Sequence, residues 1–120
     1  MRMLEPYRES ADGRGRFRGI INTGQWEEIN YLETSRGQVR GGHYHEQTLE
    51  LFFIIDGEID VHLSDARGGD RIVSVTRDDI FVIEPGEVHT FHCKTDCRWI
   101  NALSRRMNGP DADIKEPAAR

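Results

Sequence analysis

Two histidines separated by one residue, His43 and His45, are the part of the sequence best suited to chemistry. In a strand, side chains at positions i and i+2 point to the same face, so both imidazoles would project together. Glu50 follows at the head of an apolar run and shares a face with Phe52. A carboxylate buried at such a position is costly unless it is paired or bound to a cation. This spacing therefore favours a site in which His43, His45 and Glu50 bind the same ion.

A further candidate ligand, His89, comes from a distant hairpin and shares its strand face with Cys93. Three neutral imidazoles and one carboxylate form a borderline ligand set that suits Zn, Fe(II), Mn, Co, Ni or Cu. We therefore predict one divalent transition metal held by His43, His45, Glu50 and His89.

Each of these residues also has a purely structural interpretation. The histidines could sit at strand ends and turns, and Glu50 could pair with Arg40 or Arg71. Arg40 itself could bind a phosphate or carboxylate bidentately, or could pair with a neighbouring acid. We predict His43, His45, Glu50 and Arg40 as the catalytic residues.

Short strands are the elements that must position these side chains. Asp56-Gly57 is a two-residue turn signal of the type that hairpins favour. No segment has a sustained helical period with caps. Strand patterns cover Phe17–Ile21, Trp26–Thr34, Glu50–Ile55, Ile59–Leu63, Arg71–Val75, Ile80–Ile83, Val88–Cys93 and Arg98–Ser104. The fold class predicted is all-β, a single-domain antiparallel β-barrel or jelly-roll sandwich with little helix.

The length of 120 residues predicts one domain, and 37% hydrophobic residues can build its core without a structural disulfide or metal. Residues 1–16 are expected to form an N-terminal arm or an extra strand. Residues 17–106 are expected to form the barrel. Residues 107–120, which contain two prolines and several acids, are expected to form a C-terminal tail.

The net charge of −5 argues against nucleic acid as the main partner, because affinity for phosphate backbones needs clustered positive charge. No apolar run approaches the length of a membrane span, so no membrane partner is expected. The first residues carry no secretory signal, which predicts a cytoplasmic protein. The two cysteines, Cys93 and Cys97, are then expected to be reduced thiols.

Two motifs make the chain resemble the cupin superfamily. The residues from Gly37 to Gly57 read G-x5-H-x-H-x4-E-x6-G, which matches the first cupin motif in full. The second motif is matched in part from Asp78 to Cys93. Asp78, Glu84 and Cys93 stand where that motif usually has Gly, Pro and Asn, whereas Gly86 and His89 match. The departures fall on turn and packing positions rather than on ligands.

A narrower likeness involves Arg40-Gly41-Gly42-His43-Tyr44-His45, which resembles the R-G-x-H-x-H stretch of small cupins from bacterial sugar-nucleotide and polysaccharide pathways. The chain end, with Pro110 to Ile114, is similar to the ends of those isomerases and epimerases. In some of these isomerases, the ketoisomerases, the paired histidines act as acid and base without metal. A Gln often stands there at the position of Glu50. Glu50 together with His89 favours the metal-binding branch. The resemblance also implies a homodimer.

Several functions remain compatible with these residues. The first is a metal-dependent isomerase or epimerase acting on a small oxygenated, sugar-like substrate, in which the metal polarises a carbonyl. The others are an Fe(II)-type dioxygenase, a non-catalytic protein that binds a small ligand, and a metal-free ketoisomerase of nucleotide sugars that uses His43 and His45 as acid and base.

Overall fold

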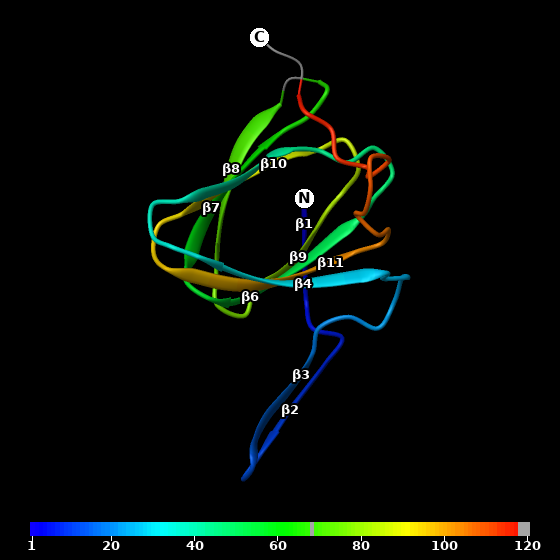
Figure 1. The fold of residues 1–120 in the computed structure, drawn as a ribbon. Helices are drawn as coiled ribbons and strands as arrows, with labels where there is room; N and C mark the ends of the chain where they lie inside the picture. The colour runs from blue at the N-terminus through cyan, green and yellow to red at the C-terminus, as the bar shows by residue number, and fades with distance from the viewer. Residues whose placement is uncertain (68, 118–120) are drawn as a thin grey trace.

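The computed structural model describes residues 1–67 and 69–117, which form strands joined by turns (Figure 1). Gly68 of the predicted polar turn and residues 118–120 of the predicted tail lie outside the described residues. The strands are β1 (Arg2–Leu4), β2 (Arg8–Asp12), β3 (Gly15–Gly19), β4 (Glu28–Thr34), β5 (Val39–His43), β6 (Glu50–Asp56), β7 (Glu58–Ser64), β8 (Asp70–Thr76), β9 (Ile80–Ile83), β10 (Val88–Cys93) and β11 (Cys97–Leu103). Within these ranges the structure contains no helix with the length and apolar character needed to span a bilayer.

Two antiparallel sheets face each other. The larger has the strand order β1-β9-β6-β11-β4, and the smaller has the order β5-β10-β7-β8. Strand β7 illustrates why the chain folds in this way, since Ile59, Val61 and Leu63 are buried while the residues between them are not. Such alternation gives a strand one face for the core and one for water. The predicted all-β antiparallel sandwich is confirmed.

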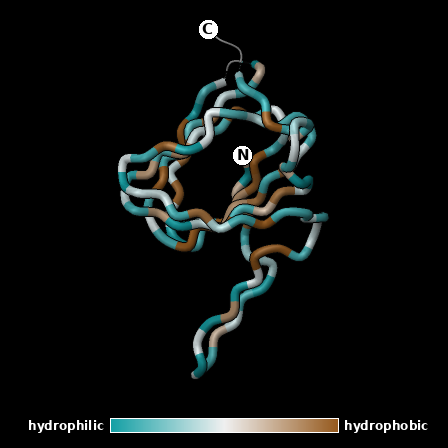
Figure 2. Tube along the Cα trace, in the orientation of Figure 1, coloured by the Kyte–Doolittle hydropathy of each residue, from teal (hydrophilic) through white to brown (hydrophobic). Residues whose placement is uncertain are grey.

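The main core lies between the sheets and is built from side chains such as Phe52, Phe91 and Trp99, which are almost fully buried. A second, smaller cluster lies around Leu51 and Val82, with Trp26 among the residues packed against it. Figure 2 shows the hydrophobic segments concentrated in the strands of the body. The interior of the sandwich is therefore mostly apolar, and His45, Glu50, His89 and Asn101 are among its few buried polar side chains.

The N-terminal residues extend the sandwich in two ways. Strand β1 joins the larger sheet beside β9, and β2 and β3 form a hairpin that projects away from the body (Figure 1). The apolar run predicted as a strand from Phe17 to Ile21 is shifted, because β3 ends at Gly19. The predicted strand beginning at Trp26 begins instead at Glu28. The segment boundaries at residues 16 and 106 stay a prediction.

Several turns use left-handed backbone, among them those at Gly57 and Asp78. Gly57, in the predicted turn between β6 and β7, has a φ of 99°. Asp78 has a φ of 73°, and it occupies the position where the second motif usually has glycine. Aspartate tolerates this conformation better than most residues, so the departure keeps the turn. At Glu84, where the motif has proline, the backbone N–H donates to Glu87 Oε1 at 3.0 Å, a bond that proline could not make.

Candidate metal centre

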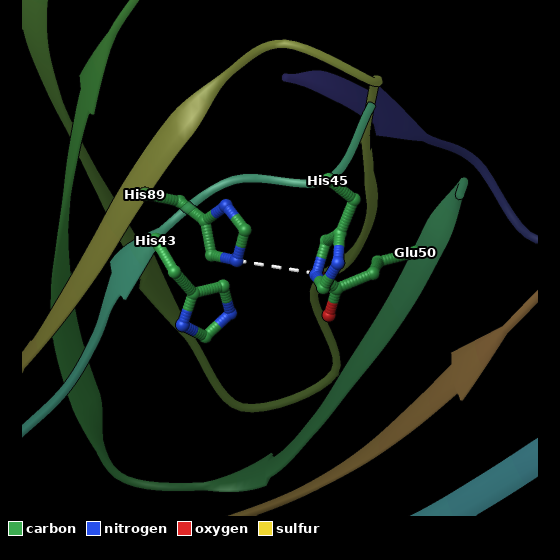
Figure 3. A group of neighbouring side chains, drawn as sticks. All are labelled: His43, His45, Glu50 and His89. Carbon is green, nitrogen blue, oxygen red and sulfur yellow. Dashed lines mark ion pairs between the residues drawn. The ribbon is translucent and has the colours of Figure 1, made fainter. Parts of the chain in front are cut away.

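The four predicted ligands come together at the seam between the two sheets (Figure 3). His43 ends β5 and His89 lies in β10, both in the smaller sheet, whereas Glu50 begins β6 in the larger one. His45 lies in the connection between β5 and β6. One possible ligand atom from each of the four lies within 4.8 Å of the others. The sequence therefore identified a group of side chains that does converge in space.

The strand argument explains only part of this convergence. Strand β5 ends at His43, so His45 is not on the same face of a continuous strand as predicted. Tyr44 instead forms an isolated bridge with Lys115, and His45 is directed by contacts beyond the strand. The two imidazoles still lie close, with ring centroids 5.1 Å apart.

Gly41 allows β5 to lie close to β10. Gly41 and Gly42 have φ values of 98° and 81°, and the register between the strands shifts between His89 and Thr90. A Cβ atom on Gly41 would lie only 2.5 Å from the His89 carbonyl oxygen. Glycine at this position therefore allows His43 to lie opposite His89, with ring centroids 4.7 Å apart.

Backbone carbonyls fix the orientation of two imidazoles. His89 Nδ1 lies 3.0 Å from the Glu87 carbonyl oxygen, and His45 Nδ1 contacts the Asp113 carbonyl oxygen. A carbonyl only accepts, so each Nδ1 carries the proton and donates it. In the neutral ring, the lone pair is then on Nε2, and it points toward Glu50. This arrangement is typical of metal-ligating histidines.

Glu50 is oriented from its other side by an amide. Asn101 Nδ2 donates to Glu50 Oε2 at 2.8 Å, which leaves Oε1 directed at the imidazoles. His89 Nε2 lies 3.1 Å from Oε1, and His45 Nε2 is in contact with the same oxygen. The side chains of Glu50, His45 and His89 are nearly inaccessible to solvent.

The contact between His45 and Glu50 joins two atoms that both accept hydrogen bonds. Within the described residues, His45 Nε2 and Glu50 Oε1 are buried and have no hydrogen-bond partner. Buried polar atoms left in this state are costly unless a positive charge lies between them. A divalent transition metal meets that need, since neutral imidazole and carboxylate are its usual ligands. The residues present therefore fit a metal ion.

The charges of the free site agree with this interpretation. Burial raises the pKa of Glu50, but the adjacent imidazoles of His45 and His89 outweigh it and bring the pKa to about 2. Burial lowers the pKa of His45, but the Glu50 carboxylate outweighs burial and the net pKa is raised. Burial and the neighbouring His89 lower the pKa of His43. A proton on His45 can thus occupy the place that a cation would take.

His43 differs from the other ligands in two respects. It is half-buried, and its ring makes no hydrogen bond to any described residue. It lines a cavity of about 80 Å³ together with His89, Asn101 and Arg40, and the remaining wall is largely apolar. His43 therefore faces the space where a small molecule could enter, and unlike His89 its ring is not held by a backbone carbonyl.

Arg40 lies at this cavity and is held by neighbouring groups. Its Nε donates to Thr34 Oγ1 at 2.7 Å, and its Nη2 donates to the Glu33 carbonyl oxygen at 3.1 Å. Arg71 instead donates to the carbonyl oxygen of Met1. The alternative in which Arg40 or Arg71 pairs with Glu50 is therefore wrong.

Two supporting residues were missed by the sequence reasoning. Asn101 is a buried amide on the inward face of β11, in phase with Trp99 and Leu103, and that phase was a usable signal. Asp113 lies in the C-terminal segment, and nothing in its neighbourhood predicts a contact with His45. Its carboxylate has a pKa lowered to about 2, because donors from residues 46–48 outweigh the effect of burial.

Comparison with known proteins places this geometry in context. The sequence model described as "Cupin domain" matches residues 31–103. Among curated proteins, none matches the chain by sequence. Solved structures are similar in fold, among them three proteins of bacterial sugar or polysaccharide metabolism.

A dTDP-4-dehydrorhamnose 3,5-epimerase from Bacillus anthracis, with TDP and PPi bound, is 20% identical with a TM-score of 0.77, over 92% of this chain and 75% of that one. A 3,4-ketoisomerase from Thermoanaerobacterium thermosaccharolyticum, a double mutant in complex with TDP, is 15% identical with a TM-score of 0.75, over 94% and 85%. The capsular polysaccharide assembling protein CapF from Staphylococcus aureus is 18% identical with a TM-score of 0.70. The match covers 95% of this chain but only 34% of CapF. At these identities the likeness concerns the fold.

Proposed function

The chain belongs to the cupin domain family, and from this premise we propose that it is a metal-dependent isomerase or epimerase of a small oxygenated, sugar-like substrate. One observation carries the metal part of the proposal. When His45 is neutral, its Nε2 and Glu50 Oε1 face each other as buried acceptors without a hydrogen-bond partner in the described residues. A cation between them, with His43 and His89 beside it, would satisfy both atoms.

The four side chains would divide the work: His45, Glu50 and His89 would hold the ion, and His43 would stay uncoordinated so that its lone pair is available. His45 and Glu50, which are buried and oriented by Asp113 and Asn101, would hold the ion firmly. The bound metal would polarise a carbonyl oxygen of the substrate. Isomerisation also needs a group that takes a proton from the neighbouring carbon and returns it. We assign this role to His43, because it lines the cavity and no described residue anchors its ring by a hydrogen bond.

The size of the cavity limits what can lie beside the ion. A volume of about 80 Å³ is small beside the roughly 300–1,000 Å³ of a typical ligand pocket. The reacting carbons of a sugar can approach, while any larger part of the substrate must remain outside, near Arg40. A guanidinium there would suit a phosphate or carboxylate. The TDP found in two of the similar structures supports a nucleotide-linked sugar as the first substrate to test.

Proton exchange at the substrate tests this function. The protein is incubated in D₂O with dTDP-4-dehydrorhamnose, and deuterium uptake next to the carbonyl is followed by mass spectrometry. We expect uptake that falls at least about 100-fold in the His43→Ala variant, as expected for loss of a proton-transfer group. Removal of metal by a chelator should have a similar effect, and added metal should restore the rate.

The alternative functions predict other results. Uptake that continues at full rate in verified metal-free protein would overturn the metal-dependent mechanism in favour of a metal-free acid–base pair. Oxygen consumption without exchange would indicate a dioxygenase. Saturable binding without exchange or product would indicate a binding protein.

We also propose that the protein is a homodimer built through the β2–β3 hairpin and the outer side of β4. All five residues of β2 are exposed, and an isolated two-stranded hairpin is only marginally stable in water. The hairpin carries four arginines against two acids, whereas the edge strand β4 and Glu27 carry only acidic charges. Phe17 on the hairpin and Ile29 and Tyr31 on β4 are exposed apolar side chains. A second copy would cover both apolar surfaces and place the hairpin, with its excess of basic residues, beside the acidic edge strand.

The oligomeric state is expected to depend on Ile29, which is 70% exposed. In light scattering, the parent should have twice the chain mass of 13.8 kDa. Ile29→Arg places a charge in the apolar patch and opposite the basic hairpin, and should weaken association at least about 10-fold. The matched control is Ile72→Arg, since Ile72 is similarly exposed but lies on β8 of the other sheet. A monomeric parent, or equal effects of both variants, would contradict this interface.

A further inference from the structure

We infer that Asp113 is a positioning residue for the metal ligand His45, and that the C-terminal segment 112–115 acts as a strap over the loop containing His45. The inference rests on the proposed metal site and concerns how one ligand of that site is held. The strap and the loop are separated by more than 60 residues in sequence, yet they make a dense set of hydrogen bonds.

The carboxylate of Asp113 binds the loop immediately after His45. Its Oδ1 accepts from the backbone N–H of Glu46 at 2.9 Å. Its Oδ2 accepts from the backbone N–H of Gln47 at 2.8 Å and from Thr48 Oγ1 at 2.7 Å. Thr48 is fully buried, so this last bond anchors the carboxylate to the interior. One side chain therefore fixes three consecutive residues of the loop.

The backbone of the strap completes the arrangement. The Asp113 carbonyl accepts the proton of His45 Nδ1, which turns Nε2 toward Glu50. Two residues later, Lys115 exchanges a pair of backbone hydrogen bonds with Tyr44, at 2.9 and 3.0 Å. The residue before His45 and the three residues after it are thus all bound to the same short segment.

The other ligands do not depend on the strap. His43 and His89 lie on paired strands, and Glu50 lies on β6 between β9 and β11. The His45 carbonyl has one further contact, from the N–H of Gly86 at 2.7 Å, but this bond leaves the imidazole free to rotate. Loss of the Asp113 carboxylate should therefore release one ligand while the sandwich keeps its fold.

Cobalt(II) binding tests this role, because its visible absorption reports the number and geometry of ligands. Asp113→Ala keeps the backbone carbonyl that contacts His45 but removes the carboxylate that holds the loop to the strap. We expect it to weaken Co(II) binding about 10- to 100-fold, the range for loss of the groups that orient a metal ligand. The spectrum of the loaded variant should also change. Asp113→Asn keeps one acceptor oxygen and should recover part of the affinity. Asp111→Ala, which removes an exposed acid just before the strap, is the matched control and should bind like the parent.

The outcomes separate the two proposals. A parent protein that binds no Co(II), Mn(II) or Zn(II) would overturn the metal site itself. A parent that binds Co(II), together with Asp113 variants of unchanged affinity and spectrum, would overturn the positioning role and leave the metal site standing. A purely structural role would lower the thermal stability of the variants without changing the Co(II) spectrum. If Asp113→Ala does not fold, the milder Asp113→Asn variant decides between these results.

Discussion

The His89→Ala variant is expected to purify with almost no metal, whereas the parent carries close to one divalent ion per chain. His89 Nε2 lies 3.1 Å from Glu50 Oε1, and the ring is buried and held by the Glu87 carbonyl. Alanine removes one ligand atom and leaves the rest of the site unchanged. Removal of a contact to a ligand alone costs about 10- to 100-fold in affinity, so loss of the ligand itself should cost more.

Elemental analysis of the untagged proteins measures this effect. His62→Ala is the matched control, because His62 lies on β7 next to β10 but faces away from the core. Metal retained by the His89 variant at the parent level would contradict the site. The identity of the metal then directs the chemistry: iron toward reactions with oxygen, and zinc or manganese toward isomerisation.

The second large effect is expected at Gly57, where alanine should destabilise the protein severely. A Cβ atom there would lie 2.5 Å from Cys97 Sγ and 2.6 Å from the Asp96 carbonyl oxygen. The residue also has a φ of 99°, which side chains disfavour. Overpacking costs about 1–3 kcal/mol, and the left-handed backbone adds roughly 1–2 kcal/mol. Since the backbone of Asp96 cannot simply rotate away, the two costs should add.

Gly37→Ala separates the two contributions to this cost. Gly37 has a φ of 81°, but a Cβ atom added there would have no heavy atom within 4 Å beyond its chain neighbours. Gly37→Ala should therefore lower the free energy of unfolding only by the cost of the left-handed backbone, about 1–2 kcal/mol. Thermal unfolding followed by circular dichroism compares the two variants with the parent. Equal shifts in Tm would show that the clash with Cys97 and Asp96 is relieved at no cost.

Much of the fold could be predicted from the sequence because most strands carry either a short apolar run, as in β9, or an alternation of apolar and polar residues, as in β10. Strands β9 and β10 have the predicted bounds, and the Asp56-Gly57 turn joins β6 to β7 as expected. The N-terminal hairpin was harder to predict, since β2 is exposed throughout and Ala11 is its one apolar residue. Its pairing with β3 depends on backbone hydrogen bonds, which the side-chain pattern does not report.

The sequence predicted which residues form the candidate site, but not which contacts orient them. The motif spacing identified His43, His45, Glu50 and His89, and all four converge. The sequence could not reveal that His45 leaves the strand, because its direction is set by Asp113, far along the chain. A contact between segments so far apart in sequence forms only in the folded chain. Local hydrophobic periodicity predicts strands and helices but not such contacts.

The position of the four side chains across the seam has a thermodynamic consequence. His89 belongs to one sheet and Glu50 to the other, so an ion held by both would cross-link the two halves of the sandwich. A ligand that binds only the folded state stabilises it by about 1.4 kcal/mol for every tenfold rise in its free concentration above Kd. The melting temperature of this protein would then rise with the free concentration of metal, because unfolding would require the ion that links the two sheets to dissociate.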